Sequence, residues 1–354
     1  IIHSAPYHQV VDDEKKMPGA KWFPGSKLNY AENLLKYRDN RPAIHFKGEG
    51  QPTQTYSYSD LYNEVEQLAH SLRELGVKKG DRVAGFIPNM PQAIIAMLAT
   101  ASIGAIWSSS SPDFGIKGVL DRFTQIEPKV IFAANGYYYN GKSFDSLDKL
   151  SNILKSLPSI EKVIIVGYSE NKPQVSHIDN AVHYSEFLST SPEPLIFEQL
   201  PFDHPLYIMY SSGTTGLPKS IVHSAGGTLI QHLKELRLHC DLSREDTIFY
   251  YTTCGWMMWN WLVSSLGLGA TIVLFDGSPF YPDGNAMWYM VDELNITIFG
   301  TSAKFIDASK EANIDPSHDA DLSSLKTILS TGSSLVEENF DYVYSKIKQN
   351  ILLA

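Results

Sequence analysis

Short apolar runs alternate with longer helix-like stretches along most of this sequence. In the first series, the pattern predicts strands at 83–87, 105–107, 130–133 and 163–166, and helices at 92–103, 118–123 and 147–154. Pro91 suits the start of the first of these helices, because a proline in the first turn loses no backbone hydrogen bond. Strands that are apolar along their whole length and alternate with helices are typical of a parallel sheet covered on both faces.

A second series begins after a polar, proline-bearing stretch at 167–204, which we interpret as a connection between two lobes. It predicts strands at 206–210, 247–251, 271–275, 296–299 and 325–329, helices at 228–238, 256–266, 287–294, 303–311 and 336–348, and a final apolar run at 351–353. The two series predict an α/β fold with two doubly wound, mainly parallel β-sheets that are flanked by helices and face each other. Ligands of such sheets bind beyond the carboxyl ends of the strands. We divide the chain into an irregular approach segment at 1–27, a first α/β subdomain at 28–204 and a second at 205–354.

Composition excludes several classes of protein. The chain has 29 Lys and Arg against 39 Asp and Glu, a net charge of −10, and no basic run, so we expect no nucleic-acid partner, although a local basic pocket for a small anion stays open. The longest apolar run, 93–107, is interrupted by polar residues and is shorter than the roughly 20 residues of a membrane span, so we expect a buried helix and no membrane partner. The two cysteines, Cys240 and Cys254, have no metal-binding partners at zinc-finger spacing. They favour a reducing, cytoplasmic location, and we assign no metal ligands.

The loop at 211–220 carries the clearest chemical signal. It consists of Ser211, Ser212, Gly213, Thr214, Thr215, Gly216, Leu217, Pro218, Lys219 and Ser220, directly after a predicted strand. The glycines allow backbone N–H groups to be exposed, the hydroxyls add donors and the lysine adds a positive charge, a set that suits a polyphosphate. The preceding strand and the terminal Pro-Lys disfavour the alternative of an ordinary solvated turn.

A Walker A loop is the nearest rival interpretation. It needs a glycine directly before its lysine and a helix that starts there, whereas Pro218 holds the glycine position. Ile221 and Val222, followed by Gly226 and Gly227, predict a strand and a turn after the lysine. The sequence therefore rejects the Walker A loop.

The loop resembles the phosphate-binding signature of the adenylate-forming enzymes, the acyl-CoA synthetase and luciferase superfamily. Blocks at 22–33, 107–115 and 120–123 are similar to the short-chain acyl-CoA synthetases. Those at 221–227, 254–261 and 300–304 are similar to one branch of them, the acetoacetyl-CoA synthetases. The resemblance extends from about Trp22 to the last residue.

The resemblance implies a two-step reaction. A carboxylate and ATP give an acyl-adenylate and pyrophosphate, and the thiol of coenzyme A then displaces AMP. For this branch the acid is acetoacetate; acetate, propionate or butyrate remains an alternative within the enzyme class. The partners are small-molecule substrates, with Mg²⁺ bridging the phosphates of ATP, and the oligomeric state is left open.

The resemblance also assigns roles to residues. Nucleotide binding falls to Ser211, Ser212, Gly213, Thr214, Thr215, Gly216, Lys219, Gly332, Ser333 and Ser334, with Lys219, Thr214 and Thr215 as the catalytic group that stabilises the departing pyrophosphate. For Gly332 and its neighbours an ordinary strand-to-helix turn is the alternative. An acyl pocket is assigned to Trp256, Met257, Met258, Trp259 and Thr331, with Asn260 donating to a keto oxygen, whereas a plain core stripe is the alternative. His223 is left between a structural and a substrate role, and Lys142 replaces one of two arginines that contact the nucleotide end of coenzyme A.

Several family elements lie outside the printed sequence. We expect the chain, which starts at Ile1 rather than Met and ends in an apolar strand, to be an incomplete large N-terminal domain without the C-terminal lid and its adenylation lysine. Because such a lid completes the closed site, we expect this piece alone to be inactive. A non-catalytic nucleotide-binding module that ends here naturally is the alternative.

Overall fold

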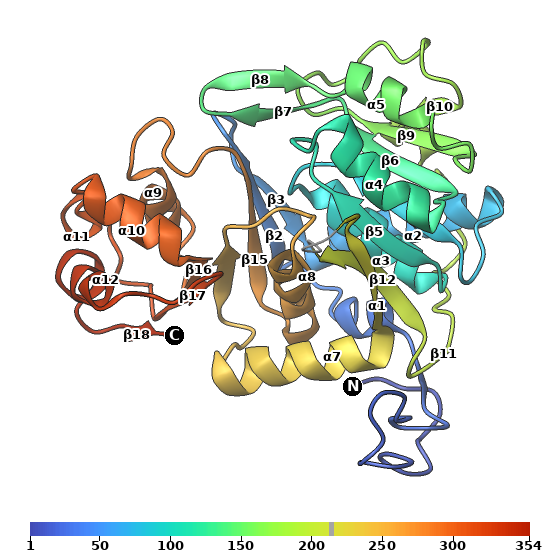
Figure 1. Cartoon of the computed structure of the whole chain (residues 1–354), viewed down its shortest axis with the longest axis horizontal. Coiled ribbons are helices and arrows are strands. Elements are labelled where there is room, and N and C mark those ends of the chain that lie inside the picture. The colour runs from blue at the N-terminus through green and yellow to red at the C-terminus, as the bar shows by residue number, and fades with distance from the viewer. Residues whose placement is uncertain (212–215) are drawn as a thin grey trace.

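Two seven-stranded sheets form the centre of the molecule (Figure 1). The structure is a computed structural model, and it describes residues 1–211 and 216–354. The first sheet has the order β10 (Ala181–His183), β9 (Lys162–Val166), β6 (Val130–Ala134), β4 (Arg82–Phe86), β5 (Ile106–Ser110), β12 (Pro205–Ser211) and β13 (Lys219–Ser224). The second has the order β18 (Leu352–Leu353), β17 (Thr327–Thr331), β16 (Ile298–Ser302), β14 (Thr247–Tyr250), β15 (Thr271–Asp276), β2 (Pro42–Gly48) and β3 (Gln54–Ser57). Within the described residues, each of these two seven-stranded sheets is parallel except for one antiparallel pair at an edge, β12–β13 in the first and β2–β3 in the second. The predicted fold class is confirmed.

The central strands are apolar along their whole length because helices cover both faces of each sheet. In β4, Val83 belongs to the core between the two sheets, whereas Ala84 and Phe86 belong to the core on the outer face. Successive strand side chains point to opposite faces, so a strand buried on both sides is apolar at every position.

The inner core is shared by both sheets and by α1 (Tyr30–Leu34), α2 (Tyr58–Glu74), α3 (Pro91–Ser102), α7 (Ala225–Lys234) and α8 (Met257–Val263). Helix α3 is apolar on all sides and is buried along almost its whole length, which confirms the helix expected in the run 93–107. The outer face of the first sheet packs on α4 (Ile116–Ile126) and α5 (Leu147–Leu154), and that of the second on α9 (Ala286–Glu293), α10 (Ala303–Glu311) and α12 (Glu337–Tyr342). Figure 1 shows these outer helices on opposite sides of the molecule.

The two sheets do not divide at residue 204. Strands β2 and β3 come from the first part of the chain but join the second sheet, where Ile44 pairs in parallel with Ile272. Conversely, β12 and β13 join the first sheet, where Tyr207 pairs with Trp107. The expected limits 28–204 and 205–354 therefore cut across both sheets, because the pairing partner of a strand depends on long-range packing that its own sequence does not encode.

Several local expectations need correction. The stretch 167–204 contains β10, α6 (Tyr184–Phe187) and β11 (Leu200–Pro201), and β10 extends the first sheet. Gly226 and Gly227 form the first turn of α7 rather than a loop, since the Ser224 hydroxyl accepts the Gly227 N–H and caps the helix. The predicted helices 228–238 and 336–348 end in π-helical turns, and 256–266 ends in a 3₁₀ turn.

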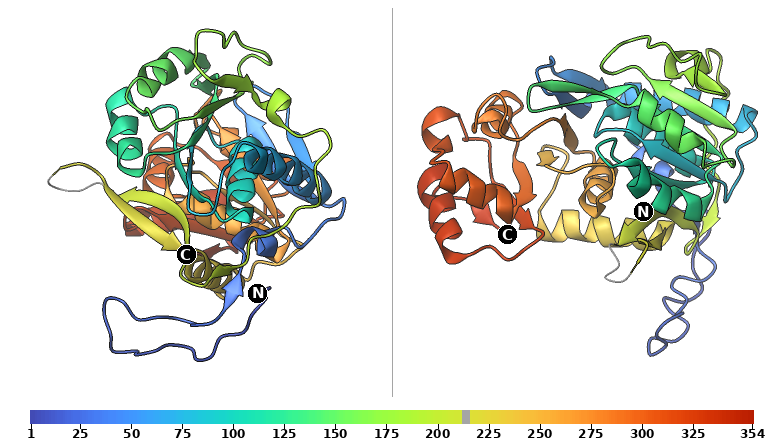
Figure 2. Two further views of the ribbon diagram at one scale, coloured as in Figure 1. Left: turned by 90° about the vertical axis from the view of Figure 1, so that its right-hand side faces the viewer. Right: turned by 45° about the horizontal axis from the view of Figure 1, so that its top comes forward.

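The remaining elements lie at the periphery. Strand β1 (Lys27–Leu28) pairs with β11, β7 (Gly136–Tyr139) pairs with β8 (Lys142–Asp145), and α11 (Pro316–Asp319) precedes β17. Figure 2 shows the first residues as an irregular loop that extends from the body. Within residues 1–211 and 216–354, no helix combines the length and the apolar character that crossing a bilayer requires.

Candidate active site

Strands from both sheets direct their carboxyl ends at one cavity of about 320 Å³. In the first sheet β4 lies between β5 and β6, and in the second β14 lies between β15 and β16. Successive strands are therefore added on opposite sides of β4 and of β14, so the strand order reverses there. Such switch points leave a crevice in which ligands of α/β sheets bind. The cavity is lined by Asn89, Ser111, Asp113, Tyr137, Tyr138, Tyr139, Phe144, Tyr251, Thr252, Thr253, Phe275, Asp276 and Gly277.

The β7–β8 hairpin supplies the aromatic wall of this cavity. Its turn residues, Asn140 and Gly141, have φ angles of +54° and +75°, which a two-residue hairpin turn requires and which Asn and Gly adopt readily. Tyr137 stacks on Phe144 of the opposite strand with ring centroids 5.0 Å apart. The hairpin follows β6 of the first sheet and reaches toward the end of β2 in the second (Figure 1).

Asp276 gives the cavity a carboxyl group that titrates near neutral pH. Burial, with a smaller contribution from the nearby carboxylates Glu49 and Asp113, raises the pKa of Asp276 to about 7, against the lowering effect of the Tyr138 N–H and the Tyr168 hydroxyl. That N–H lies 3.4 Å from Asp276 Oδ2. The cavity therefore has an aromatic lining, and its net charge changes around pH 7 as Asp276 titrates.

The predicted phosphate loop joins two antiparallel strands. Ser211 at the end of β12 pairs with Lys219 at the start of β13, and Lys219 is exposed. A strand rather than a helix follows the lysine, which confirms the rejection of a Walker A loop. Ser212, Gly213, Thr214 and Thr215 lie outside the described residues. A Cβ atom built on Gly216 meets no atom of residues 1–211 and 216–354 within 4 Å.

Helix α4 holds the end of this loop through a residue that sequence reasoning missed. Gln125 donates through Nε2 to the Pro218 carbonyl at 2.8 Å and accepts the Ser220 hydroxyl at 3.0 Å. One turn away, the Arg122 guanidinium lies 5.6 Å from the ring centre of Tyr210, the penultimate residue of β12. Arg122 and Lys219 therefore place two positive charges near the base of the loop. The position of Arg122 could be recognised only from the packing of α4 on β12–β13.

The second predicted nucleotide turn follows β17 at the carboxyl edge of the other sheet. Gly332 has φ of +93°, a conformation that L-residues rarely adopt, and a Cβ built there would meet no atom within 4 Å. Ser333 and Ser334 are exposed, and Thr331 ends the strand opposite Ser302. Among the described residues, open space thus adjoins the turn.

The residues predicted for the acyl pocket lie in two different environments. Trp256 and Met257, at the start of α8, are 65% and 36% exposed. Trp259 is fully buried and donates its indole N–H to Asn89 Oδ1 at 3.0 Å, which places it directly behind the cavity wall. Asn260 is buried, with its Nδ2 3.1 Å from Met209 Sδ and its Oδ1 without a partner among the described residues.

A buried polar network fixes the far end of α8. The Ser264 hydroxyl lies 2.6 Å from Tyr30 Oη, 2.7 Å from His232 Nδ1 and 3.1 Å from the Asn260 carbonyl. Burial lowers the pKa of His232 to about 4, so its imidazole is neutral at pH 7. Sequence reasoning missed this network, since its members are far apart along the chain.

Comparison with known proteins decides the family. Residues 31–351 match the AMP-binding enzyme family, which covers most of the sequence. The chain belongs to that family.

Individual AMP-binding enzymes narrow the comparison. The acetoacetyl-CoA synthetase of Danio rerio is 51% identical over 363 residues, covering 100% of this chain and 54% of that protein. The malonamoyl-CoA synthetase vrtB of Penicillium aethiopicum is 41% identical over 381 residues, covering 100% and 53%. A solved structure of acetoacetyl-CoA synthetase from Streptomyces lividans superposes with a TM-score of 0.94 at 43% identity, covering 100% and 55%. The chain spans about half the length of the relatives it matches.

His223 and Lys142, two further residues that sequence reasoning singled out in this AMP-binding enzyme, differ in their burial. Half-buried His223 packs on the ring of Tyr207 with centroids 5.0 Å apart, and burial lowers its pKa. Lys142 begins β8 beside the hairpin turn and is exposed. The tyrosines that precede it, Tyr137, Tyr138 and Tyr139, line the cavity.

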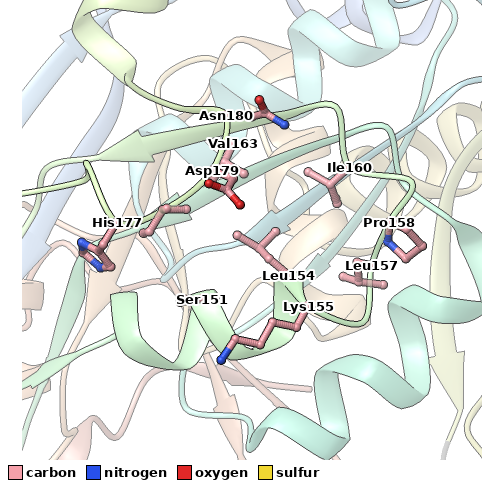
Figure 3. Close-up of a pocket in the computed structure, with 11 residues that line it drawn as sticks. Ser151, Leu154, Lys155, Leu157, Pro158, Ile160, Val163, His177, Asp179 and Asn180 are labelled. Carbon is pink, nitrogen blue, oxygen red and sulfur yellow. The ribbon is translucent and has the colours of Figure 1, made fainter.

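A second hollow, of about 300 Å³, lies at the opposite end of the first sheet (Figure 3). It is bounded by the end of α5, the start of β9 and the loop before β10, and includes Lys155, His177 and Asp179. Since it adjoins the amino ends of the strands, it is not where an AMP-binding enzyme of this fold is expected to hold its substrates.

Proposed function

We propose that the protein containing this chain activates acetoacetate with ATP and transfers the acetoacetyl group to coenzyme A. The observation that carries the proposal is the position of Lys219 and its hairpin, at the carboxyl end of β12 in the same sheet as the cavity-lining strands β4 and β5. The relatives at 51% and 43% identity, named acetoacetyl-CoA synthetases, support the choice of acid.

The first step is an in-line displacement at the α-phosphorus of ATP. A carboxylate oxygen of the acid forms the new P–O bond, the bond to the bridging oxygen breaks, and pyrophosphate leaves with its electron pair. Lys219 and the hydroxyls of the loop stabilise the charge that accumulates on the leaving group, and the turn at Gly332 accommodates the adenine end.

Mg²⁺ would be carried by the phosphates of ATP. Among residues 1–211 and 216–354, no group of three His, Cys, Asp or Glu side chains is arranged to hold a metal ion. Mg²⁺ commonly binds substrate phosphates with only one or two carboxylates, and it would neutralise phosphate charge there. No step assigned to this chain depends on a protein-held metal.

The acid is recognised through its second carbonyl group. Acetoacetate and malonamate, the acid that the Penicillium relative's name implies, both carry a carbonyl two bonds from the carboxylate. The Asn260 amide, buried next to Met209, supplies a donor for that oxygen, and the bulk of Trp259 limits the chain length. Butyrate lacks the carbonyl and would not accept a hydrogen bond from the Asn260 amide, which disfavours it.

In the second step the thiolate of coenzyme A attacks the acyl carbon, forms the thioester and releases AMP. The tyrosine-lined cavity of about 320 Å³ takes the neutral, amide-bearing thiol arm, and Lys142 at the hairpin edge meets the phosphates of the nucleotide end. Free Cys240 and Cys254 fit a cytoplasmic location and take no part in the chemistry.

The deciding experiment is a pyrophosphate-release assay on the full-length protein with acetoacetate, acetate, propionate and butyrate, followed by thioester detection after adding coenzyme A. We expect the highest kcat/KM with acetoacetate. A stronger response to acetate would overturn the choice of acid. ATP binding without pyrophosphate release from any acid would support a nucleotide-binding module instead.

A further inference from the structure

Glu49 is a buried carboxylate that joins the two sheets. It follows β2 of the second sheet and is 6% exposed. Its Oε2 accepts backbone N–H groups of Asn140 at 2.9 Å and Ser278 at 2.7 Å, and its Oε1 accepts that of Gly141 at 2.5 Å. Asn140 and Gly141 form the turn of the β7–β8 hairpin, so one side chain connects the second sheet to an extension of the first.

The backbone of Glu49 is itself fixed to the second sheet. Its N–H donates to the carbonyl of Asp276, at the end of β15, at 2.8 Å. Gly277 provides the space for this approach, because a Cβ built there would lie 2.6 Å from Glu49 Cβ. The carboxylate therefore has a rigid base.

The hairpin turn is held from its other side by an aromatic ring. A Cβ built on Gly141 would lie 2.7 Å from a ring carbon of Tyr281. The turn is thus confined between the Glu49 carboxylate and Tyr281, and its position cannot change without breaking charge-assisted hydrogen bonds. Among the described residues no cation pairs with Glu49, so the three N–H groups are what compensate its burial.

We propose that Glu49 is a positioning residue for the thiol cosubstrate. By holding the turn, it sets the position of Tyr137, Tyr138 and Tyr139 and thereby the width of the cavity. Strands β4 and β5 separate β6, from which the hairpin extends, from β12 and the phosphate loop. Glu49 therefore acts on thioester formation and leaves adenylate formation unchanged. This inference rests on the proposed function.

The test compares the two half-reactions in the full-length protein. Glu49→Ala removes all three acceptors, and Glu49→Gln keeps the size but turns one amide NH₂ toward a backbone N–H. We expect the KM for coenzyme A to rise about tenfold or more in Glu49→Ala and less in Glu49→Gln, with pyrophosphate release in the absence of coenzyme A within about twofold of wild type. Glu293→Gln is the matched control, since Glu293 also accepts hydrogen bonds from the β2–β3 region, through Lys47 and Thr53, without touching the hairpin.

A second variant perturbs the same contact without altering the carboxylate. Gly141→Ala pushes the turn against Tyr281 and should give the same rise in KM for coenzyme A. Hydrogen exchange on the full-length protein gives a readout that needs no activity: the amides of Asn140, Gly141 and Ser278 should exchange about tenfold faster in Glu49→Ala and Glu49→Gln.

The outcomes separate the two ideas. An unchanged KM for coenzyme A in Glu49→Gln and Gly141→Ala, or unchanged exchange at these three amides, overturns the role of Glu49. A wild-type protein that forms no thioester overturns the proposed function, whereas faster exchange in the variants would still establish the contact. An equal loss in both half-reactions would also overturn the inference, because it indicates a general structural role.

Discussion

The two hairpins beside the candidate site, β12–β13 and β7–β8, differ in where their chemistry comes from. The turn of β12–β13 has its glycines, hydroxyls and Lys219 within ten consecutive residues, and its described end is held by Gln125 from a neighbouring helix. The turn of β7–β8 has no comparable signal and is held by Glu49, 91 residues earlier in the chain. The groups that we propose to contact the phosphates are thus visible in the sequence, whereas the position of a cavity wall is set by residues far from it.

The largest expected effect concerns Lys219. Lys219→Ala in the full-length protein should lower the rate of pyrophosphate release about 100-fold or more, because a charge that stabilises the leaving group is lost. Exposed Lys117 on α4, paired with Asp121, is the matched lysine, and Lys117→Ala should stay within about twofold. Similar losses in both variants would contradict a specific role for the β12–β13 hairpin.

Asp276 tests the electrostatics of the cavity. Its folded-state pKa of about 7 lies above the value of 3.8 for an unperturbed carboxyl, so the folded chain retains a proton that the unfolded chain has released. Stability therefore falls as the pH rises from the unfolded to the folded pKa, by about 3 kcal/mol between roughly pH 4 and pH 7. Asp276→Asn should flatten this dependence in urea unfolding of the chain; a parallel pH dependence in the two proteins would refute a raised pKa.

Trp259 tests the wall between the cavity and α8. Trp259→Phe keeps most of the buried bulk but leaves the Asn89 amide oxygen unpaired, so we expect unfolding to become about 2 kcal/mol easier. In the full-length protein the ratio of kcat/KM for acetoacetate to that for butyrate should change as well. If that ratio is unaltered, the acyl-pocket assignment fails even if stability falls.

The smallest expected effect concerns Gln125. Gln125→Ala removes two exposed hydrogen bonds at the end of the phosphate loop and should raise the KM for ATP about two- to fivefold, without changing the KM for coenzyme A. Thr124→Ala, the adjacent change on the same helix, should leave both values unaltered. A larger rise in the KM for coenzyme A than in the KM for ATP would contradict the separate roles that we propose for the two hairpins.

Particular elements show how far sequence reasoning reached. Helices α5 and α10 were predicted with the observed limits, and most parallel strands to within two residues, because their apolar pattern reflects burial on one or both faces. Strands β2 and β3 and helix α2 were not assigned. In β2, polar His45 and Lys47 interrupt the apolar pattern, so the strand lacks the continuous run that marked the others.

The candidate site divides in the same way. The loop at 211–220 was proposed from residue types within a few positions, and Gly332 was proposed from the resemblance to the adenylate-forming enzymes. Glu49, Gln125, Arg122 and the Ser264 network were not found, because their roles depend on contacts with segments that other elements bring close.

The sequence by itself determined the alternation of strands and helices and the residue types of the loop at 211–220, both of which depend on neighbouring residues. Only the tertiary structure decided that β2 pairs with β15, that β12 belongs to the first sheet and that Glu49 holds the β7–β8 turn. The physical reason is that these pairings are selected by the packing of whole layers, in which each contact is favourable only when many distant ones form with it.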